Sequence, residues 1–315
     1  MVKKCSSVNK ILYKSINLYN THMDLIKADL HMHSRTGSDG ALYAQELAYL
    51  LHELWLEYAS LTDHDSVLWV ELIREFLLQI GSNVKIIPWL EITTHYNQKT
   101  LHLLAYGIDP NSTELTDFLV RQKNARRDRA VQIVERLNVM LKNEWLRSIP
   151  LEDILALEWE WPITRPDIAN YLLENGYVQN FQDAFTRWLV QCDVQLQSMD
   201  IYDTTRFVYE LWWTPIIAHT FAPWISLNTV ARDMSERVRL LMELKANWLQ
   251  WVEVYYQWHE NDPTVSEKIA LADSLWLLVT GGSDFHGGDK WAAPLPWWTE
   301  IPRWRFMRLL EWIMR

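Results

Sequence analysis

The stretch Ala28-Asp29-Leu30-His31-Met32-His33-Ser34 places two histidines just after a short apolar run. The run Ile26–Leu30 predicts a strand, and side chains just past a strand end are where α/β enzymes place their chemistry. His31 and His33 are two residues apart, so in extended backbone both imidazoles point the same way. A lone histidine in an apolar run is usually a hydrogen-bonded core residue, so this pair alone is weak evidence for a metal site.

Five further apolar runs end in, or enclose, a side chain that can bind a metal. The runs and their side chains are Tyr58–Thr62 with Asp63 and His64, Lys85–Pro88 with Glu91, Leu101–Leu104 with His102, Pro215–Ala218 with His219, and Leu277–Thr280 with Asp284 and His286. Asp39 follows the first run, so the set, with Asp63 left aside, uses six of the ten histidines and the three carboxylates Asp39, Glu91 and Asp284. Surface or packing roles are expected for the other histidines, His22, His52, His95 and His259.

This repeated placement favours a metal cluster over a series of unrelated core residues. Mixed nitrogen and oxygen ligands without thiolate suit Zn²⁺, Mn²⁺ or Fe²⁺, and a carboxylate such as Glu91 can bridge two ions. We therefore expect two to three divalent metal ions as cofactors.

The same segments resemble the motifs of the PHP (polymerase and histidinol phosphatase) metal-dependent phosphoesterases, in that family's order, from about residue 27 to 290. They are ADLHMHS with Ser38-Asp39-Gly40, LTDHDS (61–66), P-x-L-E-I-T (88–93), LHLLAYGID (101–109), IIAHT (216–220) and TGGSDFHG (280–287). The resemblance implies an α/β fold, a distorted TIM-like (β/α)7 barrel with metal ions at the C-terminal ends of its strands. It also implies three metal sites, formed by His31, His33, Glu91 and Asp284, by Glu91, His102 and His219, and by Asp39, His64 and His286.

Three parts are expected along the chain. Residues 1–25 are an N-terminal extension that need not be native, 26–110 and 214–315 form the barrel, and 111–213 form an inserted helical subdomain, because this connection is far longer than an ordinary crossover. Helical spacing of apolar residues predicts helices over Leu115–Leu141, Arg165–Glu174 and Phe181–Leu189.

Within the insert, Thr-Arg-Pro-Asp-Ile-Ala (164–169) resembles the subgroup that acts on nucleotide 3′-phosphates and short RNA 5′ ends. That subgroup usually has histidine after the Arg-Pro pair, whereas this chain has Asp167, and a carboxylate repels phosphate. Arg165 is still predicted to contact the substrate phosphate. The cations Arg121, Lys123, Arg126, Arg127 and Arg129 are expected to be mostly solvated, with one or two overhanging the barrel mouth.

The resemblance and the ligand set predict a phosphoric ester hydrolase. Metal-activated hydroxide would attack the 3′-phosphate of nucleoside 3′,5′-bisphosphates, or short RNA from its 5′ end, without a protein nucleophile. Asp63 and Asp65 flank His64 and are expected to orient it. The alternatives are a histidinol-phosphate-type monoesterase and a catalytically silent metal-binding PHP module.

Composition limits the partners. The formal net charge of −10 argues against binding of long duplex nucleic acid, which needs an extended basic surface, but it permits a small phosphorylated substrate. Cys5 and Cys192 are too few for a disulfide framework, so a cytoplasmic location is expected. We expect no membrane span and no obligate protein partner.

The most unusual feature of the composition is 19 Trp beside 9 Gly, since average Gly usage near ~7% would give roughly 22. Many Trp occupy places that favour Gly, which tolerates positive φ and close backbone approach. These are Trp55, Trp89, Trp212-Trp213, Trp251 and Trp276. They could be genuine aromatics, as we expect for Trp188 or Trp312 on helix faces. We favour the hypothesis that UGA encodes most of these positions. The sequence then shows Trp at codons that the source lineage translates as Gly.

Overall fold

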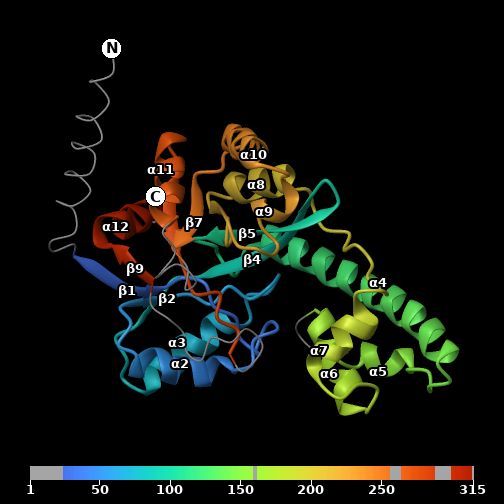
Figure 1. Ribbon diagram of the computed structural model, residues 1–315. Coiled ribbons are helices and arrows are strands. Elements are labelled where there is room, and N and C mark those ends of the chain that lie inside the picture. Colours follow the sequence, from blue (N-terminus) through green and yellow to red (C-terminus); the bar gives the residue numbers. More distant parts are fainter. Residues whose placement is uncertain (1–23, 159–161, 256–263, 288–298, 314–315) are drawn as a thin grey trace.

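The computed structural model describes residues 24–158, 162–255, 264–287 and 299–313, so the expected N-terminal extension lies almost wholly outside the described residues. The described strands form two sheets (Figure 1). One sheet has the order β3-β2-β1-β9 and consists of Lys85–Ile86, Tyr58–Ala59, Leu25–Asp29 and Thr299–Pro302. The other has the order β4-β5-β6-β7-β8 and consists of Trp89–Tyr96, Lys99–Tyr106, Thr214–Ile217, Trp251–Tyr255 and Leu278–Gly281.

The expected α/β class is confirmed, but among the described residues the strands do not close into one seven-stranded barrel. β1, β2 and β3 run parallel, as do β6, β7 and β8. β9 pairs antiparallel with β1, and β4 and β5 form an antiparallel hairpin. Two isolated parallel bridges, Met32↔Phe285 and His64↔Glu91, connect the ends of the two sheets.

The hairpin contains Glu91. The apolar run Lys85–Pro88 precedes this residue in the sequence, but β3 ends at Ile86 and Glu91 lies inside the next strand, β4. β4 and β5 are buried along most of their length, so their apolar runs lack the alternation that separates one sheet face from another. Glu91 is fully buried in that environment.

Helices cover both sheets because their apolar residues recur at helical spacing. α2 (Ala44–Glu53) buries Ala44, Leu47, Ala48 and Leu51 in a cluster that it shares with α3 (Trp69–Gln79). The second sheet packs against α8 (Ile201–Glu210), α9 (Leu227–Val230), α10 (Met234–Ala246) and α11 (Val265–Ser274). α12 (Arg303–Ile313) buries Phe306 and Leu309 beside β1.

A helical unit extends to one side of the sheets and has its own apolar cluster (Figure 1). It contains most of α4 (Thr113–Asn143), with α5 (Leu151–Leu155), α6 (Arg165–Glu174), α7 (Phe181–Asp183) and the π-helix η1 (Ala184–Leu189). All three helices predicted from the sequence are therefore confirmed. The start of α4 belongs to the other cluster, since Leu115 and Phe118 pack with β4 and β5. α8 also packs there, so the predicted limits of 111 and 213 remain a prediction.

In the part of the chain that the structure describes, no helix combines the length and the apolarity needed to cross a bilayer. Cys192 is buried and unpaired, while Cys5 lies outside the described residues.

Candidate metal centre

Glu91 is the centre of the cluster that the structure assembles. Its Oε2 lies 3.3 Å from His31 Nε2, 3.1 Å from His33 Nε2 and 3.2 Å from His64 Nδ1. Its Oε1 lies 2.9 Å from His102 Nδ1 and 3.2 Å from His219 Nε2. Each carboxylate oxygen therefore faces a separate set of imidazoles, which is the arrangement of a carboxylate that bridges two cation positions.

Asp284 completes the first predicted set of ligands. It follows β8, and its Oδ1 lies 3.4 Å from His31 Nε2 and 3.3 Å from His33 Nε2. One ligand atom from each of His31, His33, Glu91 and Asp284 lies within 4.8 Å of the others. The structure therefore brings together all four residues that the family resemblance assigned to one site.

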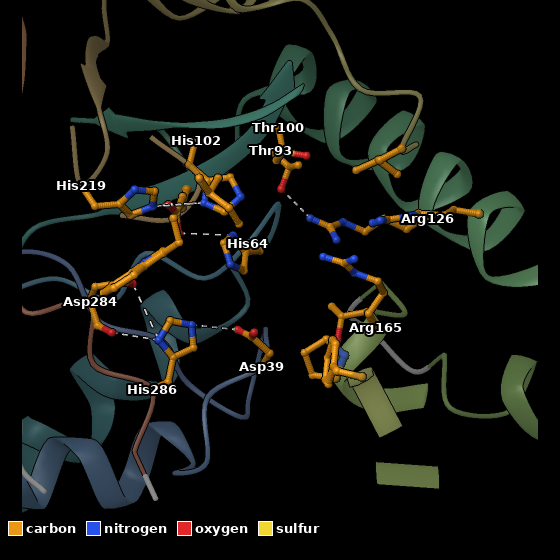
Figure 2. A pocket seen from close by; sticks show the side chains of 18 of the residues that line it. Asp39, His64, Thr93, Thr100, His102, Arg126, Arg165, His219, Asp284 and His286 are labelled. Atoms are coloured by element: carbon orange, nitrogen blue, oxygen red, sulfur yellow. Dashed lines mark hydrogen bonds and ion pairs between the residues drawn. The ribbon is translucent and has the colours of Figure 1, made fainter. Parts of the chain in front are cut away.

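The residues of the third predicted site also lie close together, and His33 joins them. His286 Nε2 lies 3.4 Å from Asp39 Oδ1, and Asp39, His64 and His286 form one group with His33. The middle set is close as well, because His102 and His219 approach each other to 3.3 Å beside Glu91. All nine predicted ligands thus lie in one connected cluster, part of which Figure 2 shows.

The donor set fits divalent cations on physical grounds. His33 is stacked on His286 with ring centroids 4.2 Å apart, and it lies 4.6 Å from His64. Charged imidazolium rings at these separations would repel one another, whereas neutral imidazoles and carboxylates around a cation would not. Nitrogen and oxygen donors without sulfur suit Zn²⁺, Mn²⁺ or Fe²⁺.

Charges within the cluster shift the pKa of its members. Burial raises the pKa of Glu91, but the nearby His102, His64 and His31 outweigh it and hold that pKa well below its usual range. Burial lowers the pKa of His33, but hydrogen bonds and charges from Asp284 and Glu91 raise it to about 10. The ionised carboxylates therefore set up a field that attracts positive charge.

Two buried acids that the sequence analysis missed support the histidines from behind. Glu253 accepts hydrogen bonds from His31 Nδ1 at 3.0 Å and from the backbone N–H of His219 at 2.5 Å. Asp29 accepts from the backbone N–H of His31 at 3.2 Å and from Ser283 Oγ at 2.6 Å, and burial raises the pKa of Asp29 to about 7. The sequence feature that could have indicated Glu253 is that it is the one charged residue within the strand Trp251–Tyr255.

The carboxylates that flank His64 have other partners than the expected one. Asp63 accepts hydrogen bonds from the backbone N–H and the hydroxyl of Ser34, at 2.6 and 2.5 Å. Asp65 accepts from Arg126 at 2.6 Å and from Gln122 Nε2 at 3.1 Å. These residues therefore fix the loop after His33 and the helix α4, rather than orienting the His64 ring directly.

A cavity of about 450 Å³ lies between this cluster and the helical unit. Its wall includes Arg126, Arg129 and Arg165, and Figure 2 shows Arg126 and Arg165 facing the histidines. The expectation that one or two cations of α4 overhang the site is thus confirmed for Arg126 and Arg129. Arg126 is almost fully buried and also donates to Thr93 Oγ1 at 2.6 Å.

Asp193 holds two of these guanidinium groups side by side. Its Oδ2 accepts from Arg165 Nη1 at 2.8 Å and its Oδ1 from Arg129 Nη2 at 2.7 Å. Burial and the neighbouring Arg165 both lower the pKa of Arg129. This pair therefore concentrates positive charge at one side of the cavity.

Asp167 occupies the position where the resembled subgroup has histidine, and here it caps α6. Its Oδ2 accepts from the backbone N–H of Thr164 at 2.8 Å and from the Thr164 hydroxyl at 2.6 Å. Together with the reciprocal bond from the Asp167 N–H to Thr164, this is a capping box. Asp167 therefore binds the N-terminus of its own helix, while Arg165 forms part of the cavity wall.

Comparisons with known proteins bear on the class of enzyme. No model of a known protein family matches the chain. The chain is 27% identical over 278 residues to "5'-3' exoribonuclease Rnm" of Salmonella typhimurium, covering 85% of this chain and 86% of that protein. It is also 27% identical over 267 residues to the "3',5'-nucleoside bisphosphate phosphatase" of Chromobacterium violaceum, covering 82% and 86%.

A solved structure agrees with the fold as well. A protein from Bifidobacterium adolescentis, assigned as a metal-dependent phosphoesterase, superposes with a TM-score of 0.74 at 25% identity, covering 90% of this chain and 96% of that one. The chain is therefore a homologue, over most of its length, of proteins named as nucleotide and RNA phosphoesterases. The resemblance expected from the motifs is confirmed.

Proposed function

We propose that this protein is a metal-dependent phosphoesterase that removes the 3′-phosphate of nucleoside 3′,5′-bisphosphates or degrades short RNA from its 5′ end. One observation carries the proposal: imidazoles and carboxylates converge on Glu91 beneath a cavity whose far wall carries arginines. The names of the relatives from Salmonella typhimurium and Chromobacterium violaceum support both substrate classes.

The proposed metal ligands are the nine residues predicted from the sequence, with Glu91 shared between sites. Divalent cations bound there would activate a water molecule and neutralise charge on the phosphate. The protein would supply the remaining geometry. Glu253 would hold His31 with its Nε2 toward Glu91, and Asp63 would fix the loop that leads to Asp39.

The proposed substrate contacts come from the helical unit. Arg165 and Arg129 present guanidinium groups to the cavity, and guanidinium binds phosphate through paired hydrogen bonds. A cavity of about 450 Å³ accommodates a nucleotide and excludes a duplex. Arg126 is a weaker candidate, because it is almost fully buried and pairs with the buried Asp65 carboxylate, whereas Arg165 and Arg129 pair with the more exposed Asp193.

We further propose that the two sheets together represent the distorted seven-stranded barrel implied by the resemblance. The bridges Met32↔Phe285 and His64↔Glu91 support this, since they connect the sheets where the ligands gather. The separate apolar cluster of α4 to η1 supports an inserted subdomain within residues 111–213.

Two alternatives make different predictions. A histidinol-phosphate-type monoesterase would share the metal ligands but would act on an amino alcohol phosphate. A silent metal-binding module would bind cations without turnover. The relatives named for RNA and nucleotide substrates favour the nucleotide phosphoesterase over both alternatives.

A substrate panel tests the proposal. Phosphate release is measured from a nucleoside 3′,5′-bisphosphate and from histidinol phosphate, and shortening of a 5′-phosphorylated oligoribonucleotide is followed in parallel, each with and without Mn²⁺. The bound metal is measured in the same samples by elemental analysis. We expect Mn²⁺-dependent turnover of the bisphosphate or the RNA. Exclusive turnover of histidinol phosphate, or metal-loaded folded protein without turnover of any substrate, would contradict the proposal.

A further inference from the structure

Seven of the described helices end in the same backbone motif. They are α2, α3, α4, α6, α8, α10 and α11. In each, the second residue after the helix donates its N–H to a carbonyl three residues back, and the next N–H reaches a carbonyl five residues back. In α2, for example, Trp55 N donates to His52 O at 3.0 Å and Leu56 N to Leu51 O at 3.3 Å. This is the Schellman motif.

The motif requires a left-handed backbone at that second residue, called C′. The observed φ angles at the seven C′ positions lie between 56° and 75°. Glycine is the usual residue there because it has no Cβ to clash with the neighbouring carbonyl, and a bulky residue with positive φ is an outlier.

Only two residue types occupy these seven positions. Glycine stands at C′ of α3 and α6, as Gly81 and Gly176. Tryptophan stands at the other five, as Trp55, Trp145, Trp212, Trp248 and Trp276. If tryptophans were placed at random, they would not be concentrated at C′, the helix-end position that favours glycine.

No packing of the indoles compensates for the strained backbone. Trp145 is 95% exposed, Trp212 is 93% exposed and Trp276 is 84% exposed. Trp55 stacks loosely on His52 but is still 77% exposed, and Trp248, which stacks on Tyr209, is 39% exposed. A Cβ at Gly81 or Gly176 would also meet nothing within 4 Å, so the Trp and Gly positions share the same open surroundings.

A buried tryptophan points the same way. The rings of Trp89 and Tyr106 are nearly parallel with centroids 2.9 Å apart, which is closer than aromatic rings pack. Position 89 therefore has too little room for an indole side chain.

We infer that residues 55, 145, 212, 248 and 276 are glycine in the native protein, with residue 89 as a further glycine position. The codon at each of these positions would be UGA. The native cell would translate UGA as glycine, whereas a genetic code that assigns UGA to tryptophan gives Trp. UGA differs from the glycine codon GGA by one base. With glycine at these six positions the chain would have 15 Gly and 13 Trp in place of 9 and 19, which is closer to ordinary usage.

A surface of exposed indoles for a binding partner is the competing explanation. Such a surface would account for exposure, but not for the confinement of these indoles to left-handed C′ positions. It also fails to account for the overlap at Trp89, which is fully buried.

Peptide masses from the protein of its native source test the inference. The tryptic peptide Asn143–Arg147 contains one disputed residue, position 145, between ordinary cleavage sites. We expect the glycine mass at 145 and in the peptides covering 55, 212 and 276, with UGA in the gene at each position. Tryptophan masses there, or UGG codons, would overturn the inference.

A second test uses the recombinant chain in three forms, with Trp, Gly or Ala at the five C′ positions. The Ala form is the matched control, because it removes the indoles but keeps a Cβ on the left-handed backbone. We expect the Gly form to have the largest soluble fraction and a thermal midpoint above that of the Ala form by roughly 2 °C or more for each position. Equal solubility and equal midpoints for all three forms would overturn the inference.

Discussion

His31 Nδ1 donates a hydrogen bond to Glu253 Oε2 over 3.0 Å, and both side chains are fully buried. The bond fixes the proton on Nδ1, so Nε2 presents its lone pair toward Glu91 and Asp284. Glu253 also accepts from the His219 backbone N–H, and thus connects histidines that follow two different strands.

Glu253→Gln should weaken metal binding by about 10–100-fold, because the amide no longer enforces that tautomer or supports the ligand's basicity. The measurement is the dissociation constant for Mn²⁺ or Zn²⁺ by competition with a chelator. Glu267→Gln, on the exposed side of α11, is the control and should leave the constant unchanged. Wild-type affinity in folded Glu253→Gln would remove this residue from the site.

Glu91→Gln and Asp284→Asn should each abolish phosphoester hydrolysis. The first change removes the negative charge shared by five imidazoles, and the second removes a ligand of the same centre. The fold should survive, which circular dichroism checks, and the exposed Glu71→Gln is the control. Near wild-type turnover with full metal content in either variant would show that the cluster is not the catalytic centre.

Arg165→Ala should raise KM, or lower kcat/KM, for phosphorylated substrates while metal content stays constant, because it removes charge-assisted hydrogen bonds to phosphate. Asp193→Asn should act in the same direction more weakly, since it releases both Arg165 and Arg129. Arg187→Ala, on the exposed side of η1, is the matched control. Kinetics of Arg165→Ala that equal the wild type would exclude Arg165 from substrate binding.

Arg126→Met should lower the free energy of unfolding by roughly 3–5 kcal/mol, because it leaves the buried Asp65 carboxylate without its charged partner. Urea unfolding measures this loss. The double variant Asp65→Asn/Arg126→Met should recover part of it, since the uncompensated charge is then gone. A double variant as unstable as the sum of both single variants would show that the pair is not coupled.

Most of the proposed metal ligands could be predicted from the sequence because they are polar residues that end or interrupt an apolar run. Glu253 could not be placed in the same way, since one charged residue inside a strand does not reveal its partner 222 residues away. The roles of Asp63 and Asp65 were also hidden, because adjacency to His64 in sequence says little about which way each side chain points. β4 and β5 are buried on both faces, so their hairpin pairing carried no periodic pattern.

The helical unit was easier to predict. The helix Arg165–Glu174 has the predicted bounds, because Thr164 and Asp167 form a capping box at its start and Gly176 follows its end. The excess of Trp was visible in the composition. Its cause required backbone angles, because only φ shows that Trp145 and Gly176 occupy equivalent positions.

Phosphate release from a nucleoside 3′,5′-bisphosphate, followed through removal and return of the metal, tests the central claim most directly. Protein with measured Mn²⁺ content is assayed, stripped with a chelator, and assayed again after Mn²⁺ is restored. We predict turnover that disappears on chelation and returns with Mn²⁺ in the wild type but not in Glu91→Gln. Turnover that persists in metal-free protein, or that returns equally in Glu91→Gln, would contradict a phosphoesterase centred on Glu91.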